Sequence, residues 1–402
     1  MDPLLSPRRE KQIVRTLAGI QFVHILDFMI MMPLGPLLME SFGIGTYAFG
    51  LLVASYTLSA AASGLLAATL IDRFERKRFL LWVFFLFLVA TLACGLAPSY
   101  QALLIARGFA GTFGGVMGAL VQTVVADVVP YVRRANASGV LSAAFSVATV
   151  AGVPLSLWLA NHLQWRTPFL FIAALALVFL LLGLRLLPEL RQHVREGSAH
   201  PFSAIAKVLQ DANHVRALLY SSMIIFSGFT VIPYITLYAV NTVGIGQNDI
   251  PLVYLLGGSA TLFSSPWIGR WADRAGKVMV YRRVALAALL PLLLVTHLGG
   301  VPLPVWLLCT TAFFVLISGR MIPAITIISS AAHPAWRGTF MSLNATVQSL
   351  SMGLATTLTG LLIARAPDGT IVGYAAVGWI AVTLNFVAIW FVGRIVIHDM
   401  EK

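Results

Sequence analysis

The chain carries the same pattern twice, and the two copies lie half its length apart. The first copy contains the motif FGIG at Phe42–Gly45, and the second contains VGIG at Val243–Gly246. The two motifs are separated by 201 residues, and so are Asp72 and Asp273, in a chain of 402 residues. This offset predicts two homologous halves. Repeated apolar halves are typical of secondary transporters, which place their site between the repeats near mid-membrane.

The hydrophobic content places the chain in a membrane. Hydrophobic residues make up 59% of it and charged residues 10%, whereas a typical soluble domain carries about 25% charged residues. We count twelve apolar spans, each near the ~20 residues that a helix needs to cross ~30 Å of hydrocarbon. The predicted spans are 15–40, 47–71, 79–97, 101–126, 137–161, 167–187, 217–241, 250–271, 281–299, 303–328, 338–364 and 371–396. The sequence therefore predicts an all-α membrane protein with twelve transmembrane helices.

The longest connection between predicted spans joins the two halves. It covers residues 188–216 and is rich in charge and histidine. We therefore predict an N-terminal six-helix bundle over residues 1–187, a cytoplasmic linker over 188–216 and a C-terminal six-helix bundle over 217–402. The two bundles are expected to be pseudo-symmetric.

The net charge of +12 reflects topology. With the N-terminus placed inside, 23 of the 27 lysines and arginines fall in inside segments, and only Arg166 and Arg365 fall in outside loops. Such an excess of cations on one side is typical of cytoplasmic loops. The distribution therefore argues against a nucleic-acid partner and predicts that both termini are cytoplasmic.

Asp27 and Arg107 are ionisable residues inside predicted spans, where charge is costly and marks function by default. Asp27 lies about 18 Å into the first span, and Arg107 lies about 21 Å from the inner surface in the fourth. Because the two depths agree within a few ångströms, the residues can form a pair. We expect Asp27 to bind the coupling proton, with a static structural pair as the alternative. His24 shares the polar face of Asp27, and Gln122 shares that of Arg107.

Other polar residues recur at helical spacing and are candidates for the substrate cavity. Arg320 lies in the tenth span with no acid obvious at its depth, so it needs carbonyls, water or an anion. The other candidates are Tyr234, Tyr238 and Asn241 in the seventh span and Asn344 and Gln348 in the eleventh. Such stripes fit a solvated cavity and equally fit hydrogen bonding between helices. Tyr234 follows Pro233, where a helix kink is expected.

Two loops resemble the signature loop of the major facilitator superfamily, a pattern like G-x-L-A-D-R-x-G-R-K. The second copy, GRWADRAGK, carries Gly269, Asp273, Arg274, Gly276 and Lys277. The first copy, ATLIDRFERKR, keeps Asp72, Arg73, Arg76 and Lys77 but has Ala68 and Glu75 where glycine is usual.

Two further segments resemble the drug–proton antiporter branch of the same family. LLIARGFAGTFGG at 103–115 is similar to the fourth-helix motif of that branch and is centred on Arg107. AGVPLS at 151–156 resembles the fifth-helix antiporter motif through Gly152 and Pro154, but it lacks the glycines that follow in relatives.

The resemblance implies two six-helix bundles that rock in an alternating-access cycle, with a gate on the cytoplasmic side. In relatives the loop aspartate meets the start of the eleventh helix, and a loop arginine pairs with an acid that ends the fourth. Here these contacts would join Asp72 to the helix beginning around Gly338, and Arg76 to Asp127. The implied gate residues are Asp72, Arg73, Arg76, Asp127, Asp273, Arg274 and Lys277. The alternative is that these charges only anchor the topology.

The sequence favours a proton-coupled exporter of small organic solutes. An alternative with the same fold is a carrier, importing or exporting, for anionic or polyhydroxylated metabolites, because Arg107 and Arg320 outnumber Asp27 and arginine suits carboxylate or phosphate. A membrane-embedded enzyme is a remote third possibility, since no zinc-spaced histidine pair, G-x-S-x-G elbow or phosphate loop is present.

The expected surroundings follow from these hypotheses. We expect a monomer in the lipid bilayer of a bacterial inner membrane, with a small-molecule substrate and the proton as coupling ion. We expect no metal, cofactor or nucleic acid.

Overall fold

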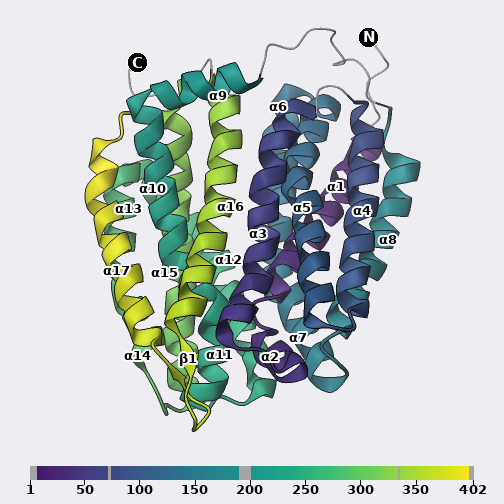
Figure 1. Ribbon diagram of the computed structural model, residues 1–402. Helices are drawn as coiled ribbons and strands as arrows, with labels where there is room; N and C mark the ends of the chain where they lie inside the picture. The colour runs from purple at the N-terminus through teal and green to yellow at the C-terminus, as the bar shows by residue number, and fades with distance from the viewer. Residues whose placement is uncertain (1–6, 71–73, 190–200, 334–335, 398–402) are drawn as a thin grey trace.

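The computed structural model describes residues 7–70, 74–189, 201–333 and 336–397, and these form two helical bundles side by side (Figure 1). The helices of the first bundle are α1 (Pro7–Ile30), α2 (Gly35–Phe42), α3 (Thr46–Leu70), α4 (Arg76–Leu96), α5 (Tyr100–Val128), α6 (Tyr131–Val147), α7 (Val153–His162) and α8 (Thr167–Leu186). Those of the second are α10 (Ala212–Phe229), α11 (Ile235–Tyr238), α12 (Ile250–Ala275), α13 (Lys277–Ala287), α14 (Leu289–His297), α15 (Leu303–Ala331), α16 (Arg337–Leu362) and α17 (Tyr374–Phe391). The short strands β1 (Ala364–Arg365) and β2 (Ile371–Val372) pair antiparallel between α16 and α17.

These helices make twelve crossings, as predicted, because α1–α2, α6–α7, α10–α11 and α13–α14 each form one broken crossing. Ten crossings in the described part of the chain are long and apolar enough to span a membrane by their own composition. The other two are α12 and α16, which pack across the interface between the bundles, α12 against α7 and α16 against α3. Their lower hydropathy fits this position, since a helix at the interface need not present an apolar surface to lipid all round.

The repeated motifs occupy equivalent places in the two halves. The first crossing breaks at a turn that contains Pro33, and the seventh breaks at a 3-10 turn over Ile232–Tyr234 that contains Pro233. Proline lacks the amide hydrogen that would continue the helix, so the expected kink is present. Gly43 and Gly244, from FGIG and VGIG, then end the broken helices with φ of 61° and 85°. Glycine adopts this left-handed conformation without a steric penalty.

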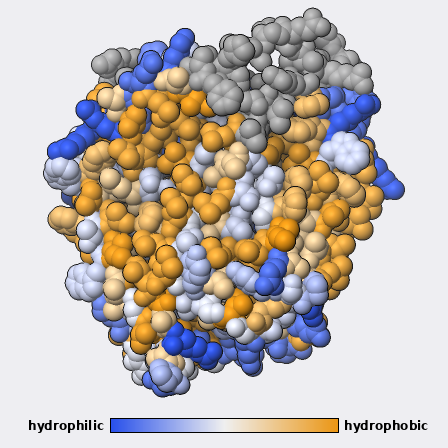
Figure 2. All heavy atoms as spheres, in the orientation of Figure 1, coloured by the Kyte–Doolittle hydropathy of each residue, from blue (hydrophilic) through white to orange (hydrophobic). Residues whose placement is uncertain are grey.

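The molecule has two polar ends. The start of α1, the end of α17 and the connecting helix α9 (Pro201–Gln210) lie at one end, here called the terminal face (Figure 1). The opposite end, the far face, carries α2, α11 and β1. Figure 2 shows hydrophobic residues in a broad band between these ends and hydrophilic residues gathered at both of them. This banding is what a bilayer-spanning protein requires, because a charged group facing the lipid hydrocarbon is costly.

Candidate functional site

A cavity of about 590 Å³ lies between the two bundles. The end of the cavity deeper in the molecule is lined by His24 and Phe28 of α1 and by Tyr56 of α3. The end nearer the terminal face is lined by Gln122, near the end of α5, and by Gly338, at the start of α16. Because both of these lie beside the terminal face, the cavity opens toward that face.

Most of the cavity wall is apolar, and the polar side chains on it carry no formal charge. None of its 18 lining residues, all in the described part of the chain, is an aspartate, glutamate, lysine or arginine. Its hydrogen-bonding side chains are His24, Tyr56, Thr57, Gln122, Ser342, Thr346 and Ser349. Hydroxyl and amide groups with a few aromatic rings can bind an uncharged polar solute and fix its orientation.

Asp27 and Arg107 form a buried ion pair, with 2.8 Å between Arg107 Nη1 and Asp27 Oδ2. The side chains are 0% and 1% exposed. Thr91 Oγ1 donates to the other carboxylate oxygen at 3.2 Å, and Arg107 Nη1 also lies 3.3 Å from the backbone oxygen of Asp27. Asp27 and Arg107 therefore lie together, as their similar depths predicted. Thr91 is a partner that the sequence analysis missed.

Tyr56 contacts both the ion pair and the cavity. The guanidinium carbon of Arg107 lies 4.5 Å from the centre of the Tyr56 ring, and Tyr56 also lines the cavity. A cation over an aromatic face is attracted by the ring quadrupole. His24 continues the wall, 6.4 Å from the Tyr56 ring. His24 Nδ1 and Tyr56 Oη are buried atoms without a hydrogen-bond partner in the described structure.

Glycines on α5 allow this close packing. A Cβ placed on Gly111 would lie 2.1 Å from the backbone oxygen of Tyr56, and one on Gly114 would lie 2.2 Å from its hydroxyl. Only glycine permits such an approach. The regular spacing of small residues on α5 predicts that another helix packs closely there. The sequence does not show that this helix is α3, so it could not identify Tyr56.

The polar stripe expected on the eleventh crossing faces away from the cavity. Gln348 Nε2 donates to Ser221 Oγ of α10 at 3.0 Å, and Asn344 is 4% exposed. Neither residue lines the cavity, whose wall on α16 includes Ser342, Thr346 and Ser349. The expectation for Asn344 and Gln348 is therefore not met in this conformation, since packing rotates that stripe toward α10.

The candidates of the seventh crossing lie at the far face. Tyr234 Oη donates to the backbone oxygens of Thr46 at 3.2 Å and Thr356 at 3.1 Å. Tyr238 packs on Tyr374 with 4.7 Å between ring centres. Asn241 is bonded to Leu237 O at 2.9 Å and accepts from Arg365. None of the three lines the cavity, and Tyr234 instead joins the two halves where the cavity is closed.

Arg320 is enclosed within the second bundle and is 1% exposed. It donates to the side-chain oxygen of Asn385 and, at 3.0 Å, to the backbone oxygen of Ile224. Asn385 donates in turn to Ala285 O at 2.9 Å. Arg320 therefore does not line the cavity, contrary to expectation. The hydrogen bonds that an acidic partner would accept are accepted by a backbone carbonyl and a side-chain amide.

The gate residues show one contact that the resemblance implied. Arg76 Nη1 donates to both carboxylate oxygens of Asp127, joining the start of α4 to the end of α5. Lys277 Nζ lies 2.6 Å from Asp273 Oδ1 within the second half. Arg274 is exposed. Asp72 and Arg73 lie outside the described residues.

Glu10 and Arg133 form a further pair at the terminal face. Their nitrogen and oxygen are 2.6 Å apart, and the pair joins α1 to α6 ahead of the membrane-spanning part of α6. Hydrogen bonds from Arg133 to Glu10, reinforced by the opposite charge, raise the pKa of Arg133 above its ordinary value.

Gly152 and Pro154 lie at a break in the fifth crossing. Residues Ala148–Gly152 form a single π-helical turn, and α7 begins immediately after it with Pro154 in its first turn. Such turns often occur at functional sites in helices. Gly152 also packs against α1, since a Cβ there would lie 2.8 Å from Leu26. The motif therefore contacts the helix that carries Asp27.

Comparison with known proteins places these features in a family. The model of the Major Facilitator Superfamily matches residues 17–356. The uncharacterized MFS-type transporter YceJ of Bacillus subtilis is 30% identical over 173 residues, which cover 43% of this chain and 44% of YceJ. A probable sugar efflux transporter of Helicobacter acinonychis is 27% identical over 255 residues, covering 63% of this chain and 64% of that protein. The matches thus span about half to two-thirds of these curated relatives.

Solved structures share the fold over nearly the whole chain. The D-xylose-proton symporter superposes with a TM-score of 0.76 at 18% identity, covering 98% of this chain and 99% of that one. A bacterial homologue of the lysosomal transporter Spinster, inward-facing and unoccupied, gives a TM-score of 0.72 at 16% identity, covering 97% and 95%.

Proposed function

Because this chain belongs to the Major Facilitator Superfamily, we propose that it is a proton-coupled exporter of a small uncharged solute that works by alternating access. The family and the curated relatives are transporters, so the protein is an integral membrane carrier of small molecules and not an enzyme. The direction of transport, the coupling ion and the class of substrate are our proposal.

The ion pair behind the cavity wall carries the proposal. Asp27 and Arg107 are buried, and Tyr56, whose ring packs on Arg107, also lines the cavity. A buried carboxylate is stable while its partner cation stays close, and it must take up a proton when that partner moves away. A rearrangement of Tyr56 on substrate binding would therefore link the cavity to protonation of Asp27.

The cavity wall favours an uncharged, hydroxyl-bearing substrate. The alternative hypothesis of an anionic substrate depended on Arg107 and Arg320 facing the cavity. Asp27 neutralises Arg107, and Arg320 is enclosed in the second bundle. Relatives named as sugar efflux transporters are consistent with a polyhydroxylated substrate.

The proposal also covers the orientation of the protein in the membrane and the membrane in which it lies. We infer that the terminal face is cytoplasmic, since the cations concentrate in the connections on that side. With the cavity open toward that face, the conformation would load substrate from the cytoplasm. We propose a monomer in a bacterial inner membrane.

The test is uptake into proteoliposomes with an acidic lumen, using full-length protein and three labelled probes: lactose, succinate and tetraphenylphosphonium. We expect lactose to accumulate, a protonophore to abolish the accumulation, and Asp27→Asn to bind lactose without accumulating it. Asp249→Asn, an acid away from the cavity, serves as the matched control and should behave as wild type. Accumulation of succinate alone, or wild-type accumulation by Asp27→Asn, would contradict the proposal.

A further inference from the structure

Thr91 of α4 contacts the carboxylate of Asp27 at the oxygen that Arg107 leaves free. Its hydroxyl donates to Asp27 Oδ1 at 3.2 Å, whereas Arg107 Nη1 lies 2.8 Å from Oδ2. Thr91 and Asp27 are both 0% exposed. The two oxygens of this buried carboxylate therefore have different partners, a neutral hydroxyl on one side and a cation on the other.

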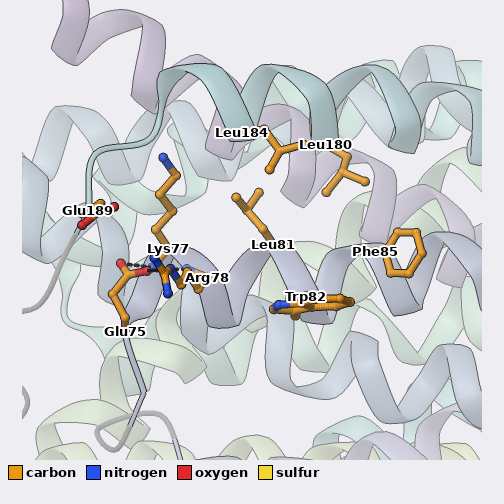
Figure 3. A pocket seen from close by; sticks show the side chains of 9 residues that line it. All are labelled: Glu75, Lys77, Arg78, Leu81, Trp82, Phe85, Leu180, Leu184 and Glu189. Atoms are coloured by element: carbon orange, nitrogen blue, oxygen red, sulfur yellow. Dashed lines mark hydrogen bonds and ion pairs between the residues drawn. The ribbon is translucent and has the colours of Figure 1, made fainter.

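Thr91 lies on the face of α4 that points into the first bundle. Figure 3 shows the opposite face, where Trp82 and Phe85 line a hollow of about 440 Å³ between α4 and α8 on the outer surface. Trp82 is 63% exposed, and Thr91 follows it by nine residues. At about 100° per residue, nine residues turn a side chain to the opposite side of the helix. The helix therefore holds Thr91 against Asp27 while its aromatic residues face lipid.

A buried threonine in the second bundle uses its hydroxyl differently. Thr310 donates to the backbone oxygen of Trp306, four residues earlier in the same helix, at 2.9 Å. This bond is common for threonine in helices. The equivalent acceptor for Thr91 is the backbone oxygen of Phe87. The Thr91 hydroxyl therefore has a second acceptor to turn to when Asp27 no longer accepts its hydrogen.

The two oxygens of Asp27 differ in their ability to hold a proton. A protonated carboxyl group carries an O–H donor, which needs an acceptor when it is buried. Arg107 has only N–H donors and stays protonated in proteins, so a proton on Oδ2 would face another donor. A hydroxyl can both donate and accept, so a proton on Oδ1 can be bonded by Thr91.

We propose that Thr91 is a positioning residue that directs the coupling proton to Oδ1 of Asp27. In the ionised state the Thr91 hydroxyl donates to the carboxylate. When a proton from water forms an O–H bond at Oδ1, this group donates to Thr91 Oγ1, and the Thr91 hydrogen turns to the Phe87 carbonyl. Release of the proton to water reverses these steps, and no other covalent bond forms or breaks. This role of Thr91 rests on the proposed function, in which Asp27 binds the coupling proton.

Other titratable or charged groups lie around Asp27 without accepting from it. They are Arg107 of α5, Tyr56 of α3, Cys94 of α4 and His24, one turn earlier on α1. The helices α6, α7 and α8 also pack against α1, but their described residues place no such group beside Asp27. Among the described residues, Thr91 and Arg107 are the two side chains hydrogen-bonded to the carboxylate. Thr91 is therefore the bonded partner that can accept a hydrogen.

The test is infrared difference spectroscopy of full-length protein in lipid vesicles during a pH titration, which follows protonation without transport. The carbonyl band of protonated Asp27 is identified by its loss in Asp27→Asn. Thr91→Val keeps the shape of the side chain but removes the hydroxyl, so we expect the band to change frequency. We also expect about tenfold stronger proton binding, a midpoint about one pH unit higher, because the ionised state loses a charge-assisted bond and the acid only a neutral one.

Thr91→Ser keeps the hydroxyl and should restore both the band and its midpoint, which a purely structural role for the threonine methyl group would not predict. Thr310→Val is the matched control, because it removes an equally buried hydroxyl that bonds only its own helix. The unfolding temperature checks that each variant is folded.

Two failures can be told apart. A wild-type Asp27 band that Thr91→Val leaves unchanged in frequency and midpoint, or a Thr91→Ser variant that behaves as Thr91→Val, would overturn the role of Thr91 alone. Absence of any Asp27 band in the wild type across the titration would overturn the proposed proton coupling, and the role of Thr91 with it.

Discussion

Gly228 faces Arg320 in the second half as Asp27 faces Arg107 in the first. Gly228 follows Asp27 by 201 residues, the same offset that separates the repeated motifs. A Cβ placed on Gly228 would lie 3.6 Å from Nη2 of Arg320. Each half therefore carries a buried arginine beside this position, although the two arginines are 213 residues apart and do not follow the repeat, and only the first half supplies a carboxylate. In place of a carboxylate, Arg320 donates to the side-chain oxygen of Asn385 and the backbone oxygen of Ile224.

Introducing an acid at position 228 should create a second ion pair. We expect Gly228→Asp to be tolerated beside Arg320, because its other neighbours leave ordinary contact distances of 3.6 Å and 3.9 Å. In an Arg320→Met background the same aspartate would be buried without a partner. A double-mutant cycle on unfolding free energy should give a coupling of about 3 kcal/mol. Gly228→Asn is the neutral control, and additive effects of the two changes would show that no pair forms.

The native pair should show the same coupling. Asp27→Asn leaves Arg107 buried without its counter-charge, so we expect a loss of about 3–5 kcal/mol in unfolding free energy. Asp27→Asn combined with Arg107→Gln should cost less than the sum of the single changes. Asp249→Asn should stay within about 0.5 kcal/mol of wild type, as expected of a position outside such a network. Fully additive losses would mean that the two residues act separately.

Features that depend on sequence position and apolar length could be predicted from the sequence. The twelve crossings followed from the apolar spans, and the kink in the seventh followed from Pro233. The contact between Asp27 and Arg107 followed from depth, because rise per residue is fixed in a helix. The contact between Arg76 and Asp127 followed from the family resemblance.

Features that depend on how a helix is rotated could not be predicted in this way. Helical spacing tells which side chains share a face, but packing decides where that face points. On α16 the stripe with Gln348 meets α10, and a neighbouring stripe with Ser349 lines the cavity. Arg320 was misplaced for the same reason, since nothing in its own helix reveals the amide of Asn385 on α17.

Arg76 and Asp127 should depend on each other in transport if they form part of the gate. Reversing one charge, as Arg76→Asp or Asp127→Arg, would set like charges side by side at the terminal face, and we expect either change to lower the transport rate. The double reversal restores the attraction and should recover most of it. Their direct effect on stability should be small, up to about 1 kcal/mol, because the pair is partly exposed. Failure of the double reversal to rescue transport would argue against a direct pair.

Tyr234 should hold the far face closed. Its one hydroxyl hydrogen is shared between the backbone oxygens of Thr46 in the opposite half and Thr356 in its own half, and a neutral hydrogen bond contributes about 0.5–1.5 kcal/mol. Tyr234→Phe should therefore increase the far-open population about two- to tenfold. The population can be measured as the distance distribution between spin labels at positions 41 and 368, in a background without Cys94 and Cys309. Tyr374→Phe is the matched control, because it loses a 2.8 Å bond to Val231 within one half. Equal shifts in the two variants would show that the bond between the halves is not what keeps the far face closed.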